Sequence, residues 1–400
     1  MLGAGKPGAE ADPSVDLQHV IRVFRRQLHF PDPGPIELYL ASIAANRLAG
    51  DPVWVLFVGG PSTGKTEIIL SGRGLRGVRL ASALTEPGLL SGTPRREKAE
   101  NARGGLLKEV GSFGILLAKD FNSVLAMHRD ARARLLAALR EVYDGQWTRH
   151  LGTDGGQELT WSGKVGLIAG CTPNIDSHHA VTAAMGERFI FYRMPPVDEE
   201  QQSLRAIDGA GHELEMRREL AKAVCGFLDG GSFPSEAPTL SEREKEGLVA
   251  GACLAARCRS SVERDPYSRQ IELIPEAEAP ARLARILRQL YEGMRVIGLE
   301  RREAWRLLQK ISLDCVPAIR RRVFETLQAA GEAVTPAEEV ANRIGYPVQT
   351  TRRVLEDLTA HGVLDVRTGL HQRKFWLLSD WSWNQFVTLE TTIPDLSGGQ

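Results

Sequence analysis

The stretch VWVLFVGGPSTGKTEIIL, from Val53 to Leu70, constrains the fold of this chain more than any other. Its first six residues, Val53 to Val58, form an unbroken apolar run, which is typical of a strand buried on both faces of a parallel sheet. Glycines end the run, and the residues after Thr66 can open a helix. A strand, a glycine-rich turn and a helix in this order direct unpaired backbone N–H groups at one point, where they favour a phosphate.

The turn fits the pattern G-x-x-x-x-G-K-[ST], the P-loop of nucleotide-binding proteins. In this motif the lysine, here Lys65, reaches the β- and γ-phosphates, and the hydroxyl of Thr66 binds Mg²⁺. The alternative is a chance glycine-rich turn, which the preceding strand disfavours. We therefore predict ATP and Mg²⁺ as cofactors. The predicted cofactor-binding residues are Gly59, Gly60, Pro61, Ser62, Thr63, Gly64, Lys65 and Thr66.

Composition is that of an ordinary globular protein. The 400 residues predict two or three domains, with 42% hydrophobic and 25% charged residues. Lys+Arg and Asp+Glu are both 50, so any attraction to nucleic acid must come from local patches. The five cysteines form no CxxC pair, which favours reduced thiols and a cytoplasmic location. No run is long enough to span a membrane.

Further apolar runs predict more strands of the same sheet. Phe113 to Ala118 (FGILLA) and Val165 to Gly170 (VGLIAG) are separated by helical patterns, as in a parallel αβα sheet. Trp147 to Trp161 is typical of a hairpin around the turn GTDGG. The predicted fold class is α/β, with a P-loop parallel-sheet core, an α-helical lid and a C-terminal winged helix.

The predicted domains follow changes of pattern along the chain. Residues 1–13 are predicted to be disordered, 14–196 form the nucleotide-binding core, 197–316 the helical lid, 317–386 the winged helix-turn-helix and 387–400 a flexible tail. The winged helix rests on three helix-sized segments followed by a β-pattern. Those segments are Ala318 to Ala330, Thr335 to Ile344 and Val348 to His361. Ser14 is the predicted cap of the first helix of the core, and Pro35 to Ala49 the second.

ATP hydrolysis needs an acid at a second strand end and cations near the γ-phosphate. Asp120 follows the strand FGILLA and is the predicted second Mg²⁺ ligand. Several segments then occur in a familiar order: GGLL at 104–107, KDFNSV at 119–124, CTP at 171–173, GERF at 186–189 and ARLARILRQL from Ala281. In this order they resemble the AAA+ ATPases, in particular the helix-hairpin branch that includes the minichromosome maintenance (MCM) helicases.

The resemblance implies roles for three further residues. Thr172 takes the position of the polar sensor 1 residue, Arg188 that of an arginine finger acting on a neighbouring subunit, and Arg282 that of the sensor 2 arginine. A finger that acts in trans implies a ring, most often a hexamer in that family. The predicted catalytic residues are Lys65, Asp120, Thr172, Arg188 and Arg282.

One departure from the family pattern concerns the acids. Where the family has DEF this chain has KDF, so that the tandem acids are reduced to Asp120 alone. Asp120 then takes either the place of the catalytic glutamate, with Lys119 at the metal position, or that of the metal ligand, with Phe121 where the base should be. We expect slow hydrolysis, or a base from elsewhere. The candidate acids for such a base are Glu109, Glu141 and Asp144.

Three regions could contact DNA. The first is the loop from Thr93 to Arg103, and the second is the predicted hairpin, whose tip holds Asp154 in place of the family's lysine. The third is the winged helix, with its recognition helix and wing. The predicted DNA-binding residues are Arg95, Arg96, Lys98, Arg149, Gln349, Thr350, Arg352, Arg353, Arg367, Arg373 and Lys374. Further candidates are His150 and Lys164 beside the hairpin and His371 on the wing.

These features lead to a main hypothesis and two alternatives. The main hypothesis is an ATP-dependent, helicase-like or replication-initiation motor acting on DNA. The first alternative is a DNA-binding regulator whose assembly is switched by ATP, which the lone acid and the acidic hairpin tip favour. The second is a protein remodeller that docks its protein partners through the winged helix.

Overall fold

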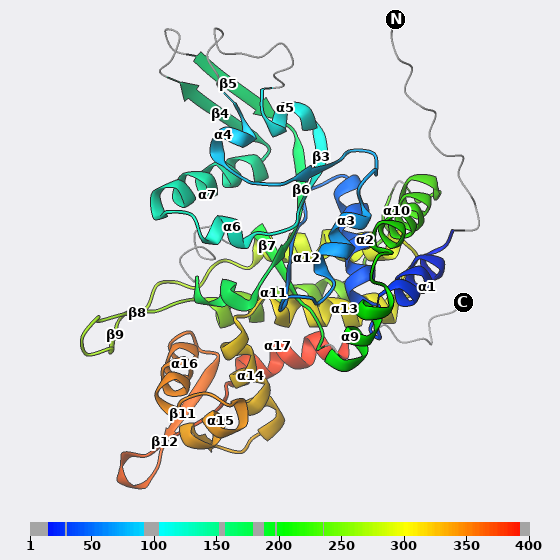
Figure 1. Cartoon of the computed structure of the whole chain (residues 1–400). Coiled ribbons are helices and arrows are strands. Elements are labelled where there is room, and N and C mark those ends of the chain that lie inside the picture. Colours follow the sequence, from blue (N-terminus) through cyan, green and yellow to red (C-terminus); the bar gives the residue numbers. More distant parts are fainter. Residues whose placement is uncertain are drawn as a thin grey trace, which may run out of the picture. The chain divides into compact units, whose positions relative to one another are not determined.

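The computed structural model describes residues 15–28, 30–91, 104–151, 157–178, 188–196, 198–234 and 236–392. Figure 1 shows the elements along the chain. The chain divides into two compact units. The first comprises Met1–Met185, Arg193–Pro238 and Glu292–Leu299, and the second comprises Gly186–Tyr192, Thr239–Tyr291 and Glu300–Gln400.

A five-stranded sheet in the order β2-β3-β6-β1-β7 forms the centre of the α/β fold. The pairs β2–β3, β3–β6 and β6–β1 are parallel, so that the carboxyl ends of these strands meet at one edge. The predicted strands are confirmed. β2 was not predicted, because only the first and last of its four residues are buried and they form no unbroken apolar run. The strands are β1 (Trp54–Val58), β2 (Val78–Ala81), β3 (Phe113–Ala118), β6 (Lys164–Cys171) and β7 (Phe189–Arg193).

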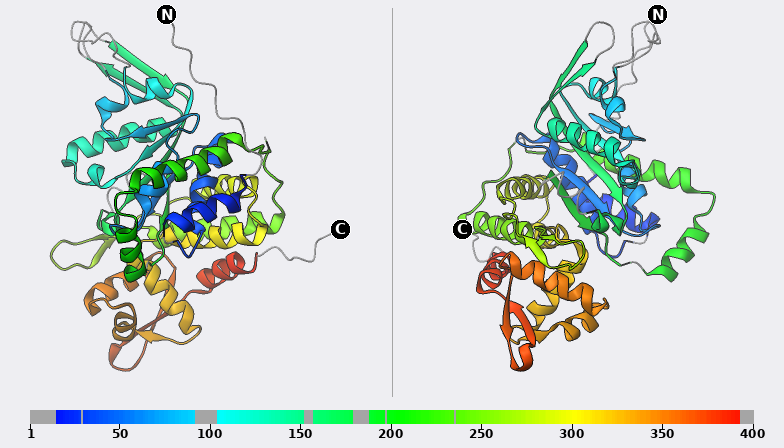
Figure 2. Two further views of the ribbon diagram at one scale, coloured as in Figure 1. Left: turned by 45° about the vertical axis from the view of Figure 1, so that its right-hand side comes forward. Right: turned by 90° about the vertical axis from the view of Figure 1, so that its left-hand side faces the viewer.

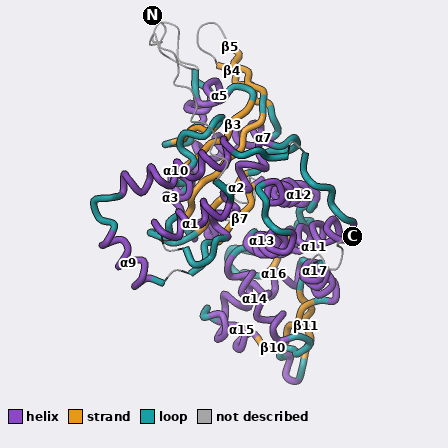
Figure 3. Tube along the Cα trace, turned by 90° about the vertical axis from the view of Figure 1, so that its right-hand side faces the viewer, coloured by secondary structure: helices purple, strands orange, loops and turns teal. Residues whose placement is uncertain are grey.

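Helices pack around this sheet. The second of them, α2, is buried along almost its whole length, and α10 packs against α1 and α3 (Figure 3). The predicted cap of α1 is wrong: Asp16 is the N-cap, since its carboxylate accepts a hydrogen bond from the His19 N–H at 2.6 Å. The helices are α1 (Leu17–Gln27), α2 (Gly34–Arg47), α3 (Lys65–Ser71), α4 (Glu86–Leu89), α5 (Leu106–Val110), α6 (Asn122–Leu125), α7 (Arg129–Tyr143), α9 (Glu199–Asp208) and α10 (Glu213–Gly230).

The predicted hairpin is present and projects away from the sheet (Figures 1 and 2). Its strands are β4 (Gln146–Leu151) and β5 (Gln157–Ser162), and Trp147 lies opposite Trp161, as the sequence predicts. The tip, with Asp154, lies outside the described residues.

The C-terminal region is helical and contains a small antiparallel sheet. Its first helix begins with a capping box, in which Ser241 and Glu244 exchange hydrogen bonds. Helices α14, α15 and α16 lie beside a three-stranded sheet in the order β10-β12-β11 (Figure 3). The predicted boundary at residue 386 falls inside α17. The elements are α11 (Glu242–Arg259), β8 (Glu263–Arg264), β9 (Ile271–Leu273), α12 (Ala281–Val296), α13 (Arg301–Asp314), α14 (Ala318–Ala330), β10 (Thr335–Pro336), α15 (Ala337–Ile344), α16 (Val348–Ala360), β11 (Leu364–Thr368), β12 (Lys374–Leu378) and α17 (Asp380–Thr391).

Candidate functional site

The predicted P-loop connects the carboxyl end of β1 to the first turn of α3. The Gly59 N–H donates to the Cys171 carbonyl at 3.0 Å, which fixes the start of the loop to β6. Gly64 has φ +77°, and a Cβ there would lie 2.4 Å from Cζ of Phe30. Both the left-handed backbone and the contact with a buried ring therefore require glycine at this position.

The Lys65 ammonium lies folded over this loop. Its Nζ donates to the Gly59 carbonyl at 2.9 Å, to the Gly60 carbonyl at 2.5 Å and to Thr63 Oγ1 at 2.8 Å. Burial lowers the pKa of Lys65, while the nearby Cys171 and Asp120 raise it. The carbonyl oxygens offer the ammonium only partial negative charge. A phosphate bound in the loop would place full negative charge beside the ammonium and so favour its protonated form.

The ends of β3 and β6 are linked through an amide. Asp120 Oδ1 accepts from the backbone N–H of Asn122 at 2.8 Å and from its Nδ2 at 2.5 Å. Asn122 Oδ1 in turn accepts from Thr172 Oγ1 at 2.7 Å and from its backbone N–H at 3.2 Å. Asn122 thus fixes the relative positions of the predicted acid and the predicted sensor. The sequence analysis did not identify this residue.

The thiol of Cys171, the last residue of β6, feels the charges of Lys65, Asp120 and Asp176. Burial raises the pKa of the Cys171 thiol to about 12. The charges of Asp120 and Asp176 raise this pKa further, and the charge of Lys65 lowers it. Hydrogen bonds give the same arrangement: Lys65 binds the Gly59 carbonyl, the Gly59 N–H binds Cys171, and Asn122 joins Asp120 to Thr172. The three residues therefore lie at the carboxyl edge of the sheet, where ligands of open parallel sheets bind.

The residues at this edge fit Mg²⁺ chemistry. Thr66 and Asp120 are both exposed, and they offer a hydroxyl and a carboxylate oxygen. Such hard oxygen donors suit Mg²⁺, which is usually held by one or two carboxylates together with substrate phosphates. Among the residues that the structure describes, none donates a hydrogen bond to the other carboxylate oxygen of Asp120, Oδ2.

Further contacts around the loop come from residues that the sequence patterns did not mark as functional. The Gln202 side-chain amide of α9 donates to the Ser62 carbonyl. Arg217 of α10 pairs with Glu67 of α3 through two hydrogen bonds of 2.7 and 2.9 Å. These contacts tie both helices to the loop and to the start of α3.

A second ion pair lies beyond Thr172, at the same edge of the sheet. Arg193, at the end of β7, binds Asp176 with both terminal nitrogens at 2.8 Å. Both side chains are largely buried, and the pairing neutralises Asp176. No motif marks either residue, because the pair joins positions seventeen residues apart.

Two of the three candidate bases, Glu109 and Asp144, lie away from Asp120. Glu109 lies in α5, ahead of the amino end of β3, and β3 spans roughly 17 Å at about 3.3 Å per residue. Asp144 precedes the hairpin, whose base meets the amino end of β6 through the hydrogen bond from the Gly163 N–H to the Gly145 carbonyl. Neither Glu109 nor Asp144 lies at the edge that holds Asp120.

The two remaining catalytic candidates belong to other parts of the chain. Arg188 precedes β7 and is largely buried, with 8% of its surface exposed. Arg282 is the second residue of α12 and is half-buried. Their roles stay predictions.

The predicted DNA contacts of the first unit differ in accessibility. Arg95, Arg96 and Lys98 lie outside the described residues. Arg149 is held against the body of the unit, since it donates to the Leu90 carbonyl at 2.7 Å and pairs with Glu86 at 3.1 Å. His150, the next residue of β4, is exposed.

The C-terminal region presents the other predicted contacts on one helix and one strand pair. Gln349, Thr350 and Arg353 are exposed on α16, whereas Arg352 is half-buried. Glu338 of α15 pairs with Arg352 at 3.3 Å and with Arg373 at 3.6 Å. One carboxylate thus neutralises two predicted phosphate contacts, one on α16 and one beside β12. Exposed side chains near the strand pair are Arg367, His371, Arg373 and Lys374.

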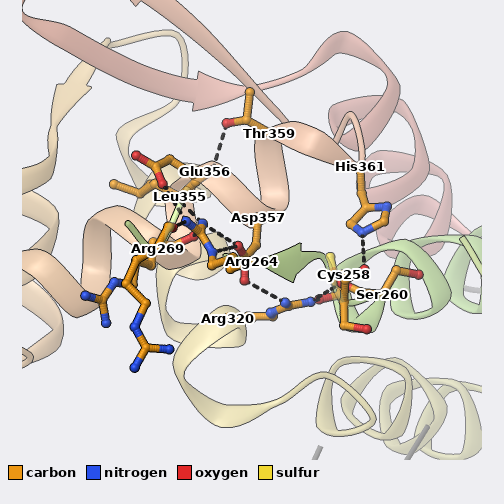
Figure 4. A network of polar contacts seen from close by, with 12 residues as sticks. Cys258, Ser260, Arg264, Arg269, Arg320, Leu355, Glu356, Asp357, Thr359 and His361 are labelled. Carbon is orange, nitrogen blue, oxygen red and sulfur yellow. Dashed lines mark hydrogen bonds and ion pairs between the residues drawn. The ribbon is translucent and has the colours of Figure 1, made fainter. Parts of the chain in front are cut away.

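A buried polar network holds the second half of α16. Figure 4 shows Arg264 and Arg320 converging on Asp357, and Arg264 also binds Glu356. Arg264 reaches Asp357 Oδ1 at 2.6 Å, and Arg320 reaches Oδ2 at 3.0 Å. Arg320 also donates to the Cys258 carbonyl at 3.0 Å. The network therefore neutralises the two acids of α16 and fixes this helix to the end of α11 and to β8.

Replacing Asp357 with alanine is expected to destabilise the second unit by about 3 kcal/mol, because two largely buried guanidiniums lose their shared partner. Urea unfolding together with hydrogen exchange of the α16 amides measures the effect. Glu339→Ala is the matched control. It breaks an exposed pair with Arg343 and should cost less than about 1 kcal/mol. Equal costs for the two variants would contradict a stabilising role of the network.

Among the described residues, none of the helices combines the length and apolar character needed to cross a bilayer. Comparison with models of known protein families gives no match, and a search of curated protein sequences finds no significant similarity.

Proposed function

We propose that this chain is a Mg²⁺-dependent ATPase that acts on DNA. The observation that carries the proposal is the cluster at the carboxyl edge of the sheet, where Lys65, Asp120 and the Asn122–Thr172 pair meet. A glycine-rich loop at a helix start, a lysine, and an acid on a nearby strand are the parts that phosphoryl transfer requires.

Each residue of the cluster has a definite role in this proposal. The loop N–H groups and Lys65 bind the β- and γ-phosphates, and Thr66 and Asp120 hold Mg²⁺ between them. Thr172 is directed by Asn122 and orients the attacking water or the γ-phosphate. Mg²⁺ supplies neutralisation of the charge that develops on the phosphate oxygens.

Hydrolysis is proposed to be slow. Asp120 is the single acid after β3, and Lys119 and Phe121 flank it. Asp176, the other acid beside Cys171, has both carboxylate oxygens engaged by Arg193 at 2.8 Å, so it is not oriented to activate a water. A water that lacks an effective base reacts slowly even when the phosphates are well held.

The resemblance to AAA+ proteins extends the proposal to a ring that is completed by neighbouring subunits. Arg188 would then act as a finger in trans. Its largely buried side chain would have to become accessible to reach a second subunit, so this part of the proposal requires a rearrangement on assembly.

DNA is proposed to bind α16 and the exposed cations near β11 and β12, as in winged helices. Exposed Gln349 and Arg353 near the start of α16 suit contacts to base edges and phosphates in a major groove. The neutralisation of Glu356 and Asp357 by Arg264 removes two charges that would repel the phosphate backbone.

A DNA-binding regulator switched by ATP is the second candidate, because Asp120 is the only acid in the Lys119–Asp120–Phe121 segment. A strand-displacement assay on forked DNA separates the two functions. Unwinding that is lost in Lys65→Ala supports the motor. Site-specific duplex binding without unwinding supports the regulator. A protein that binds neither ATP nor DNA would contradict the proposal as a whole.

Arg353→Ala is expected to lower duplex affinity about tenfold at low salt and to reduce the salt slope by about 1, because it removes an exposed cation near the start of α16. Fluorescence anisotropy over a salt series measures both quantities. Arg343→Ala is the control, because it removes an exposed arginine of the neighbouring helix α15 that is not a predicted contact. An equal loss of duplex affinity in both variants would mean that overall positive charge, and not a contact through α16, governs DNA binding.

A further inference from the structure

The first unit contains a second polar pocket, at the amino edge of the sheet. It has a volume of about 490 Å³, and its walls come from the end of α2, the turn before β2, the starts of β3 and β6, and the end of α10. β6 runs from this pocket to the candidate nucleotide site and spans roughly 23 Å, at about 3.3 Å per residue. The two sites are therefore separate. The lining side chains that matter here are Arg47, Arg76, Phe113, Lys164 and Asp229.

One cation and one acid of this pocket neutralise each other. Arg47 Nη2 lies 2.6 Å from Asp229 Oδ1, and Arg47 also donates to the Leu228 carbonyl at 2.6 Å. The other carboxylate oxygen of Asp229 accepts from the backbone N–H of Arg76 at 2.9 Å. Both carboxylate oxygens of Asp229 therefore already have partners within the protein.

Two further cations keep hydrogen-bonding capacity. Lys164 Nζ donates to the Leu48 carbonyl at 2.7 Å, its single hydrogen bond to the described residues. The Arg76 side chain, 81% exposed, donates to the Asp229 carbonyl at 2.8 Å, and its Nε lies 3.9 Å from Asp229 Oδ2. Asp51 acts electrostatically on Lys164. Three cations therefore face two acids, and the ammonium and guanidinium can each donate further hydrogen bonds.

The positive charge of Lys164 is only partly balanced by its surroundings. Burial lowers its pKa to about 8, and the attraction of Asp51 offsets only part of this effect. A bound anion would supply the missing negative charge. Phe113 stands beside Lys164 in the paired strands, packs over Gly77 and exposes 36% of its surface. An apolar ring therefore lies next to the cations.

We propose that this pocket binds a phosphate-bearing ligand, with the phosphate against Lys164 and Arg76 and the adjoining part of the ligand against the Phe113 ring. An ammonium and a guanidinium on separate elements suit an anion with several oxygens. The volume is within the range of small-ligand sites. The site is independent of the proposed ATPase function, and it can exist whether or not the loop at 59–66 binds ATP.

Calorimetric titration with pyrophosphate tests the proposal in a Lys65→Ala background, which removes the lysine of the other phosphate site. Saturable binding is expected there, and adding Lys164→Met should weaken it at least tenfold. Lys108→Met is the matched control, since Lys108 also donates to one backbone carbonyl, that of Thr160 at 2.6 Å, but lies outside the pocket. Unchanged binding in Lys164→Met, or an equal loss in Lys108→Met, would overturn the site.

Two further arms make the test specific. Arg76→Gln changes an exposed side chain, so it should weaken binding without impairing folding, even if Lys164→Met misfolds. Affinity should also fall as pH rises through about 8, because Lys164 loses its proton, and this pH dependence should vanish in Lys164→Met. Displacement of pyrophosphate by mononucleotides alone identifies a small ligand, whereas displacement by single-stranded DNA identifies a backbone phosphate. No weakening in Arg76→Gln would contradict the assignment.

Discussion

Replacing Lys65 with alanine is expected to weaken ATP binding at least about 100-fold, because two charge-assisted hydrogen bonds of roughly 1.5 to 3 kcal/mol each are lost. Hydrolysis should fall below detection. In the protein the ammonium is bound by Gly59, Gly60 and Thr63, so it is already positioned at the phosphate site. Equilibrium binding of a fluorescent ATP analogue measures the loss.

The control for this variant is Lys108→Ala, which removes an exposed lysine of the same unit. It should bind ATP with the affinity of the unaltered chain. Thermal unfolding of Lys65→Ala must stay close to that of the unaltered chain for the loss to be assigned to the phosphates. Retention of tight ATP binding in a folded Lys65→Ala protein would refute the P-loop assignment.

Replacing Asp120 with asparagine is expected to lower Mg²⁺-dependent ATP hydrolysis by about 100-fold or more while ATP binding changes only a few fold. Asparagine can still accept the hydrogen bond from the Asn122 N–H, so the substitution removes the charge and preserves the turn. Steady-state phosphate release over a Mg²⁺ titration measures both the rate and the metal requirement.

Asp130→Asn is the matched control, since Asp130 is exposed at the start of α7 and lies 3.9 Å from His128. Its hydrolysis rate should equal that of the unaltered chain. If Asp120→Asn hydrolyses ATP at the same rate as Asp130→Asn, then Asp120 neither holds the metal nor activates the water.

The strands of the central sheet could be predicted because their burial on both faces leaves unbroken apolar runs. Phe113–Ala118 agrees with its predicted range, and β1 and β6 agree within one or two residues. The strand β2 could not be predicted in this way. Its residues Val78 and Ala81 are buried while Arg79 is exposed, so its place in the sheet depends on pairing with β3.

The candidate site was predictable only in part, because only some of its residues directly follow an apolar run. Lys65 and Asp120 follow apolar runs directly, and parallel strands bring their carboxyl ends to one edge. Asn122 gives no such signal, because its importance depends on the register that sets β3 beside β6, fifty residues apart in sequence. The ion pairs of Arg149 and Arg193 could not be predicted from the sequence, because each arginine pairs with an acid on a different element.

The sequence by itself determined the strands that are buried on both faces, β2 excepted, and it marked the glycine-rich loop as a candidate phosphate site. These properties follow from local patterns: apolar periodicity, glycine where the backbone is left-handed, and unpaired N–H groups at a helix start. Only the tertiary structure decided which charges meet. It joined Asp120 to Thr172 through Asn122, separated Glu109 from Asp120, and grouped Lys164 with Arg76 at the opposite edge. Such groupings depend on strand order and packing, which no local pattern specifies.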